Sequence, residues 1–149
     1  MKECCAIPAA AQAIMNRRFG KDMLIALATQ EGDWPHVRTV DAYYLDGAFY
    51  VVTHALSGKM RQMKSNPHVA VCGEWFTGHG VGENLGWVRA KENAALMDTL
   101  RGVFSAWYTC GHVDEKDENT CLLRIRLTHG VLMSEGVRYE WGEAPIRDD

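Results

Sequence analysis

The sequence predicts a mainly β fold with helices, of the α+β class, in which a small barrel carries attached helices. Asp46-Gly47 joins two β-rich runs, which is the strongest short-range signal of a β-hairpin because glycine tolerates a positive φ. Residues 121–133 alternate apolar and polar side chains, as a strand with one buried face does. Helical spacing is confined to a few segments. Many strands joined by hairpins, with few helices, favour a barrel.

Length and charge limit what the chain can be. Its 149 residues most simply form one domain, residues 1–149, and a domain of that size buries about 68–70% of its unfolded surface. With 16 basic and 19 acidic residues, it lacks the basic excess of general nucleic-acid-binding proteins. Apolar runs such as Met23–Thr29 are far shorter than the roughly 18 residues of a membrane span. We therefore expect a soluble protein that binds neither nucleic acid nor membrane.

The cysteines and histidines give no metal signature. Five cysteines occur at irregular spacing with no secretory signal before them, which favours reduced thiols and a cytoplasmic location. Cys4 and Cys5 are adjacent, but no second pair lies at ligand spacing. The six histidines are scattered without paired helical spacing. We therefore expect no metal site.

The first half of the chain contains a helix, a strand, a hairpin and a second helix. Proline at a first helical position and Gly20 as a stop delimit the first helix, and the run after it is apolar without alternation, as in a strand covered on both faces. Asn66-Pro67 ends the second helix. The expected elements are a helix over Pro8–Phe19, strands over Met23–Thr29, 36–45 and 48–54, and a short helix within Thr53–Pro67.

In the second half, strands flank one amphipathic helix. The apolar residues of 92–108 recur at helical spacing, so its aromatic side chains are expected in the core. A glycine-rich segment, Thr77–Gly86, is expected to be a loop, and residues 114–119 a polar surface loop. The expected strands cover His68–Phe76, 121–133 and 136–142.

The short helix within Thr53–Pro67 has features of an anion site. Leu56, Met60 and Met63 share one face, and Ser57 is a natural N-cap. The first turn of a helix leaves backbone N–H groups unpaired at the positive end of the dipole. Lys59 lies in that turn, where a cation costs a few tenths to about 1 kcal/mol unless an anion offsets it. The alternative is that Ser57 only caps and Lys59 points into solvent.

Arg38 favours the anion site over the alternative. It lies on the first hairpin strand, and Thr53 ends the second, so both can stand beside the helix start. One Lys, one Arg and two hydroxyl groups suit a phosphate, with charge-assisted bonds worth about 1.5–3 kcal/mol each. Arg61 and Lys64 are expected in solvent.

Four motifs occur in order at matching spacing: R-T-V at 38–40, D-G at 46–47, T-x-x-x-S-x-K at 53–59, and N-P at 66–67. With them the chain resembles the pyridoxamine 5′-phosphate oxidase-like flavoprotein superfamily. The resemblance covers about Leu24–Trp87 by motif and the rest by element order. It implies a six-stranded antiparallel split β-barrel with flanking helices, forming a homodimer with FMN at the subunit interface.

The resemblance also implies roles for individual residues. Arg38, Ser57 and Lys59 look like phosphate ligands, the backbone of Thr39, Val40 and Asp41 would face the isoalloxazine ring, and Val52 and Thr53 would contact the ribityl chain or phosphate. Gly58 lies at the position where family members often have an arginine, which implies weaker binding of the phosphate. The tail Trp141–Asp149 lacks the basic, aromatic motif of the true oxidase, so vitamin oxidase activity is not expected.

The leading functional hypothesis is an FMN-dependent oxidoreductase acting on a small-molecule substrate or an external reductant. His79 is a weak candidate for a catalytic acid or base, with an ordinary exposed loop residue as the alternative. The second hypothesis is a non-catalytic sensor or carrier that holds flavin or haem on the same barrel. The third is a reductase that uses a deazaflavin. No nucleophile elbow, P-loop or dinucleotide fingerprint is present, so hydrolase and NTPase functions are not expected.

A homodimer is expected from the ligand's size as well as from the family. One small barrel would leave a face of the planar flavin ring in water, and a second subunit could cover it. Trp75, Phe76 and Trp87, near strand ends, are expected to supply apolar contact area. The alternative is a monomer whose own core contains these aromatic side chains.

Overall fold

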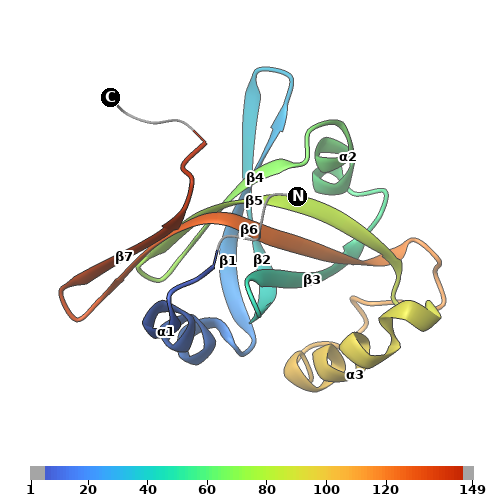
Figure 1. Cartoon of the computed structure of the whole chain (residues 1–149). Coiled ribbons are helices and arrows are strands. Elements are labelled where there is room, and N and C mark those ends of the chain that lie inside the picture. Colours follow the sequence, from blue (N-terminus) through green and yellow to red (C-terminus); the bar gives the residue numbers. More distant parts are fainter. Residues whose placement is uncertain (1–5, 146–149) are drawn as a thin grey trace.

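A computed structural model of the chain describes residues 6–145 (Figure 1). Seven strands, three α-helices and one 3-10 helix follow one another in these residues. Their order is α1 (Ala9–Phe19), β1 (Met23–Glu31), β2 (Trp34–Leu45), β3 (Ala48–His54), α2 (Gly58–Ser65), β4 (His68–Gly73), β5 (Phe76–Trp87), η1 (Lys91–Asn93), α3 (Ala94–Val103), β6 (Thr120–Ser134) and β7 (Val137–Gly142).

Six strands form a closed antiparallel barrel. The sheet runs β3-β2-β1-β4-β5-β6-β7, and a further pairing between β3 and β6 closes the first six strands on themselves. The seventh strand extends β6 as a hairpin that projects from the barrel (Figure 1). The predicted six-stranded antiparallel split barrel with flanking helices is confirmed.

The β2–β3 hairpin pairs only near its turn. Asp46 and Gly47 take φ values of 48° and 84°, as expected for the left-handed positions of a two-residue turn. β3 pairs with β6 along its whole length, whereas its pairing with β2 ends at Tyr43 and Tyr50; beyond this point β2 pairs only with β1. The two strands therefore separate at their far ends, which opens a gap in the barrel wall.

The barrel interior is filled by alternate side chains of its strands and closed at one end by α1. Ile25, Leu27 and Thr29 of β1 point inward and are buried. Phe19, at the end of α1, packs edge-on against Phe49 of β3 with ring centroids 5.6 Å apart. Burying an aromatic side chain in this way contributes about 1.5–3 kcal/mol through the hydrophobic effect.

A second core cluster lies outside the barrel, beneath α3. Met97, Leu100 and Phe104 are fully buried and pack with Leu122, which points outward from β6. The predicted amphipathic helix therefore exists, although it ends at Val103 and continues as turns. The predicted inward residues of β6, such as Leu123 and Ile125, are buried in the barrel.

The glycine-rich segment Thr77–Gly86 was predicted to be a loop, and this prediction is wrong. It forms most of β5, which pairs with β4 on one side and β6 on the other. Its glycines are needed for close packing: a Cβ at Gly80 would lie 2.6 Å from the backbone oxygen of Arg126. The glycines of this segment therefore allow neighbouring strands to approach closely, and they do not mark a flexible turn.

Smaller differences concern element ends and exposed faces. The strand predicted over His68–Phe76 ends at Gly73, and Trp75 occupies a tight turn with a φ of 51°. Leu56 precedes α2 and is 72% exposed, whereas it was predicted to point inward. In the single chain β1 is covered on one face only, since Leu24 is 61% exposed.

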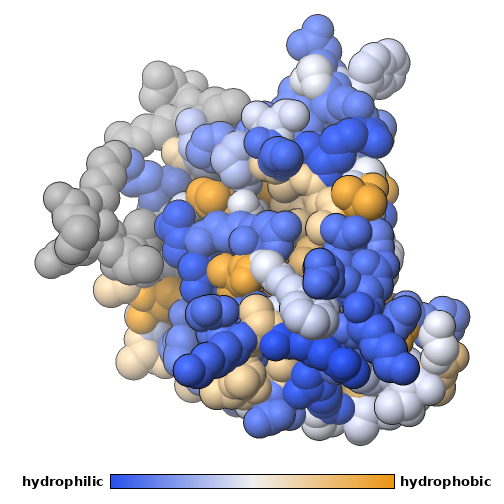
Figure 2. Space-filling model, turned by 90° about the vertical axis from the view of Figure 1, so that its right-hand side faces the viewer, coloured by the Kyte–Doolittle hydropathy of each residue, from blue (hydrophilic) through white to orange (hydrophobic). Residues whose placement is uncertain are grey.

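None of the helices in residues 6–145 is both long and apolar enough to cross a membrane. The side of the molecule that carries α2 and α3 is mainly hydrophilic, with small separate hydrophobic patches (Figure 2). The adjacent Cys4 and Cys5 lie outside the described residues, as do the last four residues of the C-terminal segment.

Candidate functional site

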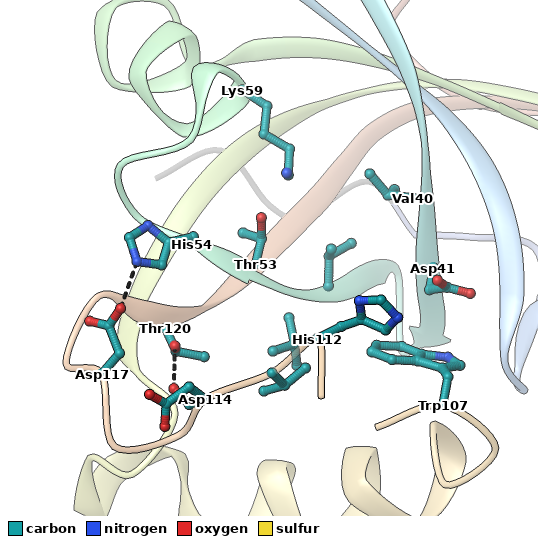
Figure 3. Close-up of a pocket in the computed structure, with 13 residues that line it drawn as sticks. Val40, Asp41, Thr53, His54, Lys59, Trp107, His112, Asp114, Asp117 and Thr120 are labelled. Carbon is teal, nitrogen blue, oxygen red and sulfur yellow. Dashed lines mark hydrogen bonds and ion pairs between the residues drawn. The ribbon is translucent and has the colours of Figure 1, made fainter. Parts of the chain in front are cut away.

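A cleft of about 390 Å³ lies where β2 and β3 separate (Figure 3). Ligand pockets usually measure about 300–1,000 Å³, so this cleft can hold a small ligand. The opening arises from the fold: β3 leaves β2 to pair with β6, and the chain between α3 and β6 covers the other side. Its walls are formed by Val40, Asp41, Val51, Val52, Thr53, His54, Lys59, Trp107, His112, Val113, Asp114, Asp117 and Thr120.

The N-terminus of α2 stands at one end of this cleft. Ser57 occupies the N-cap position, as predicted, but its hydroxyl group caps no backbone N–H. Its Oγ atom is buried without a hydrogen-bond partner in the described part of the chain. Lys59, two residues further on, is half-buried and points into the cleft (Figure 3). A buried donor without a partner costs about 1–3 kcal/mol, which a bound acceptor would recover.

Arg38 lies beside α2 and is held in place by polar contacts. Its Nη1 donates to the hydroxyl of Thr29 at 2.6 Å and to the carbonyl of Leu27 at 3.3 Å, and Nη2 donates to Oε1 of Gln62 at 2.8 Å. Gln62 is itself fixed by Glu31, which accepts from Nε2 at 3.2 Å. Since a guanidinium has five N–H donors, two remain for a ligand.

Arg38 and Lys59 form a pair of like charges. Burial lowers the pKa of Lys59, and the nearby Arg38 guanidinium lowers this pKa further. Burial also lowers the pKa of Arg38. Within residues 6–145, neither side chain forms an ion pair with a carboxylate. Two partly desolvated cations, an unpartnered hydroxyl and a helix N-terminus together fit a phosphate group.

The opposite end of the cleft is aromatic and acidic. Trp107 lines it, and its Nε1 donates to Oδ2 of Asp22 at 3.0 Å, which fixes the indole plane. Asp41 faces the cleft beside the indole (Figure 3). Burial raises the pKa of the Asp41 carboxyl, and the adjoining Asp22 carboxyl raises it further. This end therefore offers a flat apolar wall and a carboxyl group that binds its proton more tightly than usual.

Several cleft residues were missed by sequence reasoning. Nε2 of His54 donates to the Asp117 carboxylate at 2.8 Å, and the Thr120 hydroxyl donates to the carbonyl of Asp114 at 2.6 Å, so these contacts hold the loop before β6 at the rim of the cleft. His112 belongs to the same connection. Residues 114–119 read as an ordinary polar loop, and Trp107 fits a helical core stripe. No local signal distinguishes them, because only the folding of this connection over the sheet brings them to the cleft.

The structure brings most of the predicted site residues together. Val40, Asp41, Val52, Thr53 and Lys59 line the cleft, and Ser57 starts the helix at its end. Arg38 is close enough to Lys59 to affect its pKa. The two exceptions are Thr39, which is exposed opposite Ala26 of β1, and His79, which lies on β5.

No family model matches the sequence, and no curated protein matches it. Solved structures, in contrast, match the fold of this chain. A pyridoxamine 5′-phosphate oxidase candidate from Listeria innocua matches with a TM-score of 0.59 and 15% identity, covering 82% of this chain and 94% of its own. An FAD-binding protein from Mesorhizobium loti matches with a TM-score of 0.65 and 16% identity, covering 93% and 99%.

A heme binding protein from Mycobacterium smegmatis matches with a TM-score of 0.66 and 17% identity, over 91% of this chain and 58% of its own. At these identities the likeness establishes the fold. The chain thus has the split-barrel fold of pyridoxamine 5′-phosphate oxidase-like and flavin-binding proteins. The architecture expected from the four sequence motifs is therefore shown.

Proposed function

We propose that the chain binds FMN in the cleft between β2 and β3 and acts as an FMN-dependent oxidoreductase. The observation that carries this proposal is the unbalanced charge at one end of the cleft. Arg38 and Lys59 lack carboxylate partners among the described residues, and the Ser57 hydroxyl lacks any partner. A phosphate at this point would accept from all three and from the first N–H groups of α2.

The rest of the cleft suits the remainder of FMN. Thr53, next along the wall, offers a hydroxyl for the ribityl chain, while Val40 and Val52 offer apolar surface. Trp107 provides a plane against which the ring system could stack. When bound, FMN supplies hydride or electron transfer, and the protein binds and orients it. The reaction partner would be a small-molecule substrate or an external reductant, in the cytoplasm.

The proposal includes a homodimer with FMN at the interface. The outward face of β1, β2 and β4 is apolar although it is open in the single chain: Leu24 and Val37 are 61% and 71% exposed. Ala26, Ala28 and Cys72 continue this face around a hollow of about 220 Å³. Leu24 pairs with Asp41, so a second subunit seated here would reach the cleft. This placement also accounts for the apolar run Met23–Thr29, which lacks alternation.

The test has two steps. First, the absorption spectrum of the purified protein and the mass of the released ligand identify the cofactor. Second, fluorescence quenching compares FMN with riboflavin, which has the same ring but no phosphate. We expect FMN to bind at least tenfold more tightly, since one charge-assisted bond is worth about 1.5–3 kcal/mol. Equal affinities would exclude the phosphate site.

A non-catalytic sensor or carrier that holds haem or flavin is the second candidate. It is favoured by His112, which lines the cleft and could act as an axial ligand. One of the similar structures is a heme binding protein. An intense Soret band that is lost in His112→Ala, with no flavin in the released material, would support this alternative.

A further inference from the structure

A chain of three ionisable side chains crosses the sheet on β5, β6 and β7, apart from the cleft. His79 and His129 face each other with their Nδ1 atoms 3.5 Å apart. Nε2 of His129 lies 3.0 Å from Oε1 of Glu140. The other carboxylate oxygen of Glu140 accepts from Arg138 at 2.7 Å. None of these residues lines the proposed cofactor cleft.

The two histidines are direct partners across β5 and β6, next to a β-bulge. His79 pairs with His129, whereas Gly80 pairs with Leu127, so Thr128 is an extra residue on β6. The Thr128 hydroxyl donates to the carbonyl of His79 at 3.2 Å and holds the bulge. Bulges are enriched next to active sites because they redirect side chains. The two histidines pair in the register that begins at Phe76 and Leu132, and the bulge follows this pair.

The contacts determine which nitrogen atoms carry protons. His129 is only 6% exposed, and its Nε2–H donates to the Glu140 carboxylate, so its Nδ1 is an acceptor when the ring is neutral. His79 must then donate from Nδ1, which leaves its Nε2 without a proton. Burial lowers the pKa of His79, and His129 lowers it further, so the neutral ring is favoured at neutral pH. Among residues 6–145, no group donates to Nε2 of His79.

His79 borders a hollow of about 260 Å³ between β1, β4 and β5. Gln30 and His68 supply polar groups to this hollow, and Ala28 and Ala70 supply apolar surface. The titratable neighbours of the relay are His68 on β4 and Arg138 on β7.

We propose that Glu140, His129 and His79 form a proton relay, and that His79 accepts a proton from a small weak acid bound in the adjoining hollow. The O–H or N–H bond of the ligand breaks and an N–H bond forms at Nε2 of His79. The proton on Nδ1 of His79 is then shared with Nδ1 of His129, and the Glu140 carboxylate balances the added positive charge. No electrons are transferred, so the step needs no cofactor and stands independently of FMN binding.

The first test measures the tautomers. Nitrogen NMR of the full-length protein, at a pH where the rings are neutral, should show His79 protonated on Nδ1 and His129 on Nε2. In Glu140→Gln, His129 should lose this preference and His79 should shift toward protonation on Nε2. The matched control is Glu135→Gln, an exposed change on the same β6–β7 hairpin, which should leave both rings unaltered. Protonation of His79 on Nε2 in the unmutated protein would overturn the relay.

The second test uses para-nitrophenol, a weak acid that turns yellow on ionisation. Protein in excess should raise the ratio of phenolate to phenol relative to free probe at the same pH, because the imidazolium formed at His79 pairs with the phenolate. His79→Ala should abolish this rise, Glu140→Gln should reduce it, and Glu135→Gln should preserve it. Failure of the probe to bind, or binding without ionisation, would overturn the proposal. If the His129–Glu140 pair has only a structural role, the protein should not increase the ionisation of para-nitrophenol. This result does not depend on whether the protein binds FMN.

Discussion

At the scale of single residues, Lys59 is a cation whose surroundings disfavour its charge. A cation in the first turn of a helix is unfavourable by itself. In the structure Lys59 is half-buried and close to Arg38. Burial and the positive charge of Arg38 both lower the pKa of Lys59 and so disfavour its charged form. A bound anion would offset these unfavourable contributions and so stabilise the charged lysine at this position.

Lys59→Ala should therefore weaken FMN binding by about 1.5–3 kcal/mol, roughly ten- to more than a hundredfold. Riboflavin binding should change little, because it lacks the phosphate. Lys64→Ala is the matched control, since this lysine lies exposed on the same helix. Titration by flavin fluorescence measures the binding of FMN and of riboflavin to each variant and to the unmutated protein. An equal loss of FMN and riboflavin affinity would mean that Lys59 supports the fold rather than the phosphate.

Asp41 gives a prediction about pH and stability. Its pKa is raised in the folded protein, so folding disfavours its ionised form. The resulting penalty is absent below the unfolded pKa, near 3.9, and is complete once the pH exceeds the folded pKa. Asp41→Asn should thus stabilise the protein at about pH 7, by a few tenths to about 1 kcal/mol, because the carboxyl is only partly buried.

Urea unfolding at about pH 7 and about pH 3 checks this expectation, with a gain at the higher pH only. Asp33→Asn, in the exposed β1–β2 turn, should change stability little at either pH. A destabilised Asp41→Asn protein at neutral pH would show that the ionised carboxylate is favoured by the fold, contrary to this account.

At the scale of elements, β5 shows how composition can mislead. Its glycines meet different neighbours: a Cβ at Gly80 would lie 2.6 Å from the backbone oxygen of Arg126, whereas a Cβ at Gly82 would lie 2.4 Å from the flexible side chain of Met63. A backbone neighbour can move only if the strand moves. A thioether side chain can adopt another rotamer.

Gly80→Ala should therefore destabilise the fold by about 1–3 kcal/mol, the usual cost of overpacking, while Gly82→Ala should cost less than about 1 kcal/mol. Thermal or urea unfolding of the two variants provides the comparison, and each serves as control for the other. Equal losses would indicate that the general cost of replacing a strand glycine, rather than the contact with β6, determines the effect.

At the scale of the whole molecule, the apolar outer face of β1, β2 and β4 is uncovered in the single chain, where Leu24 and Val37 are exposed. Of the three aromatic residues expected at an interface, Phe76 is buried in the barrel core and Trp87 donates to the carbonyl of Glu115 beneath α3. Trp75 alone is well exposed, at 71%. The contact area proposed for a second subunit is therefore centred on Leu24 and Val37 instead.

Light scattering across a concentration series should give twice the chain mass of 16.7 kDa, with and without FMN. Val37→Lys should shift the protein toward monomer, since a charge in an apolar interface is costly to desolvate. Val137→Lys, an exposed valine on β7, is the matched control. A stable 16.7 kDa monomer that keeps one FMN per chain would show that one subunit completes the site.

Local signals by themselves determined the hairpin at Asp46-Gly47, the alternation of β6 and the start of α2 at Ser57. These features depend on neighbours within a few residues, through turn geometry, side-chain period and unpaired N–H groups at a helix start. The motif order was enough to predict the six-stranded split barrel, and of the residues that line the cleft it selected Val40, Asp41, Val52, Thr53 and Lys59.

Only the tertiary structure decided the rest. It made a strand of Thr77–Gly86, because the value of a glycine there lies in contacts with a strand some fifty residues away in sequence, at Arg126. It brought Trp107 and His112 to the cleft by folding one connection over the sheet. It paired His79 with His129 across β5 and β6. Each of these contacts links distant parts of the chain, and no local pattern encodes such a pairing, because its energy exists only once the barrel has closed.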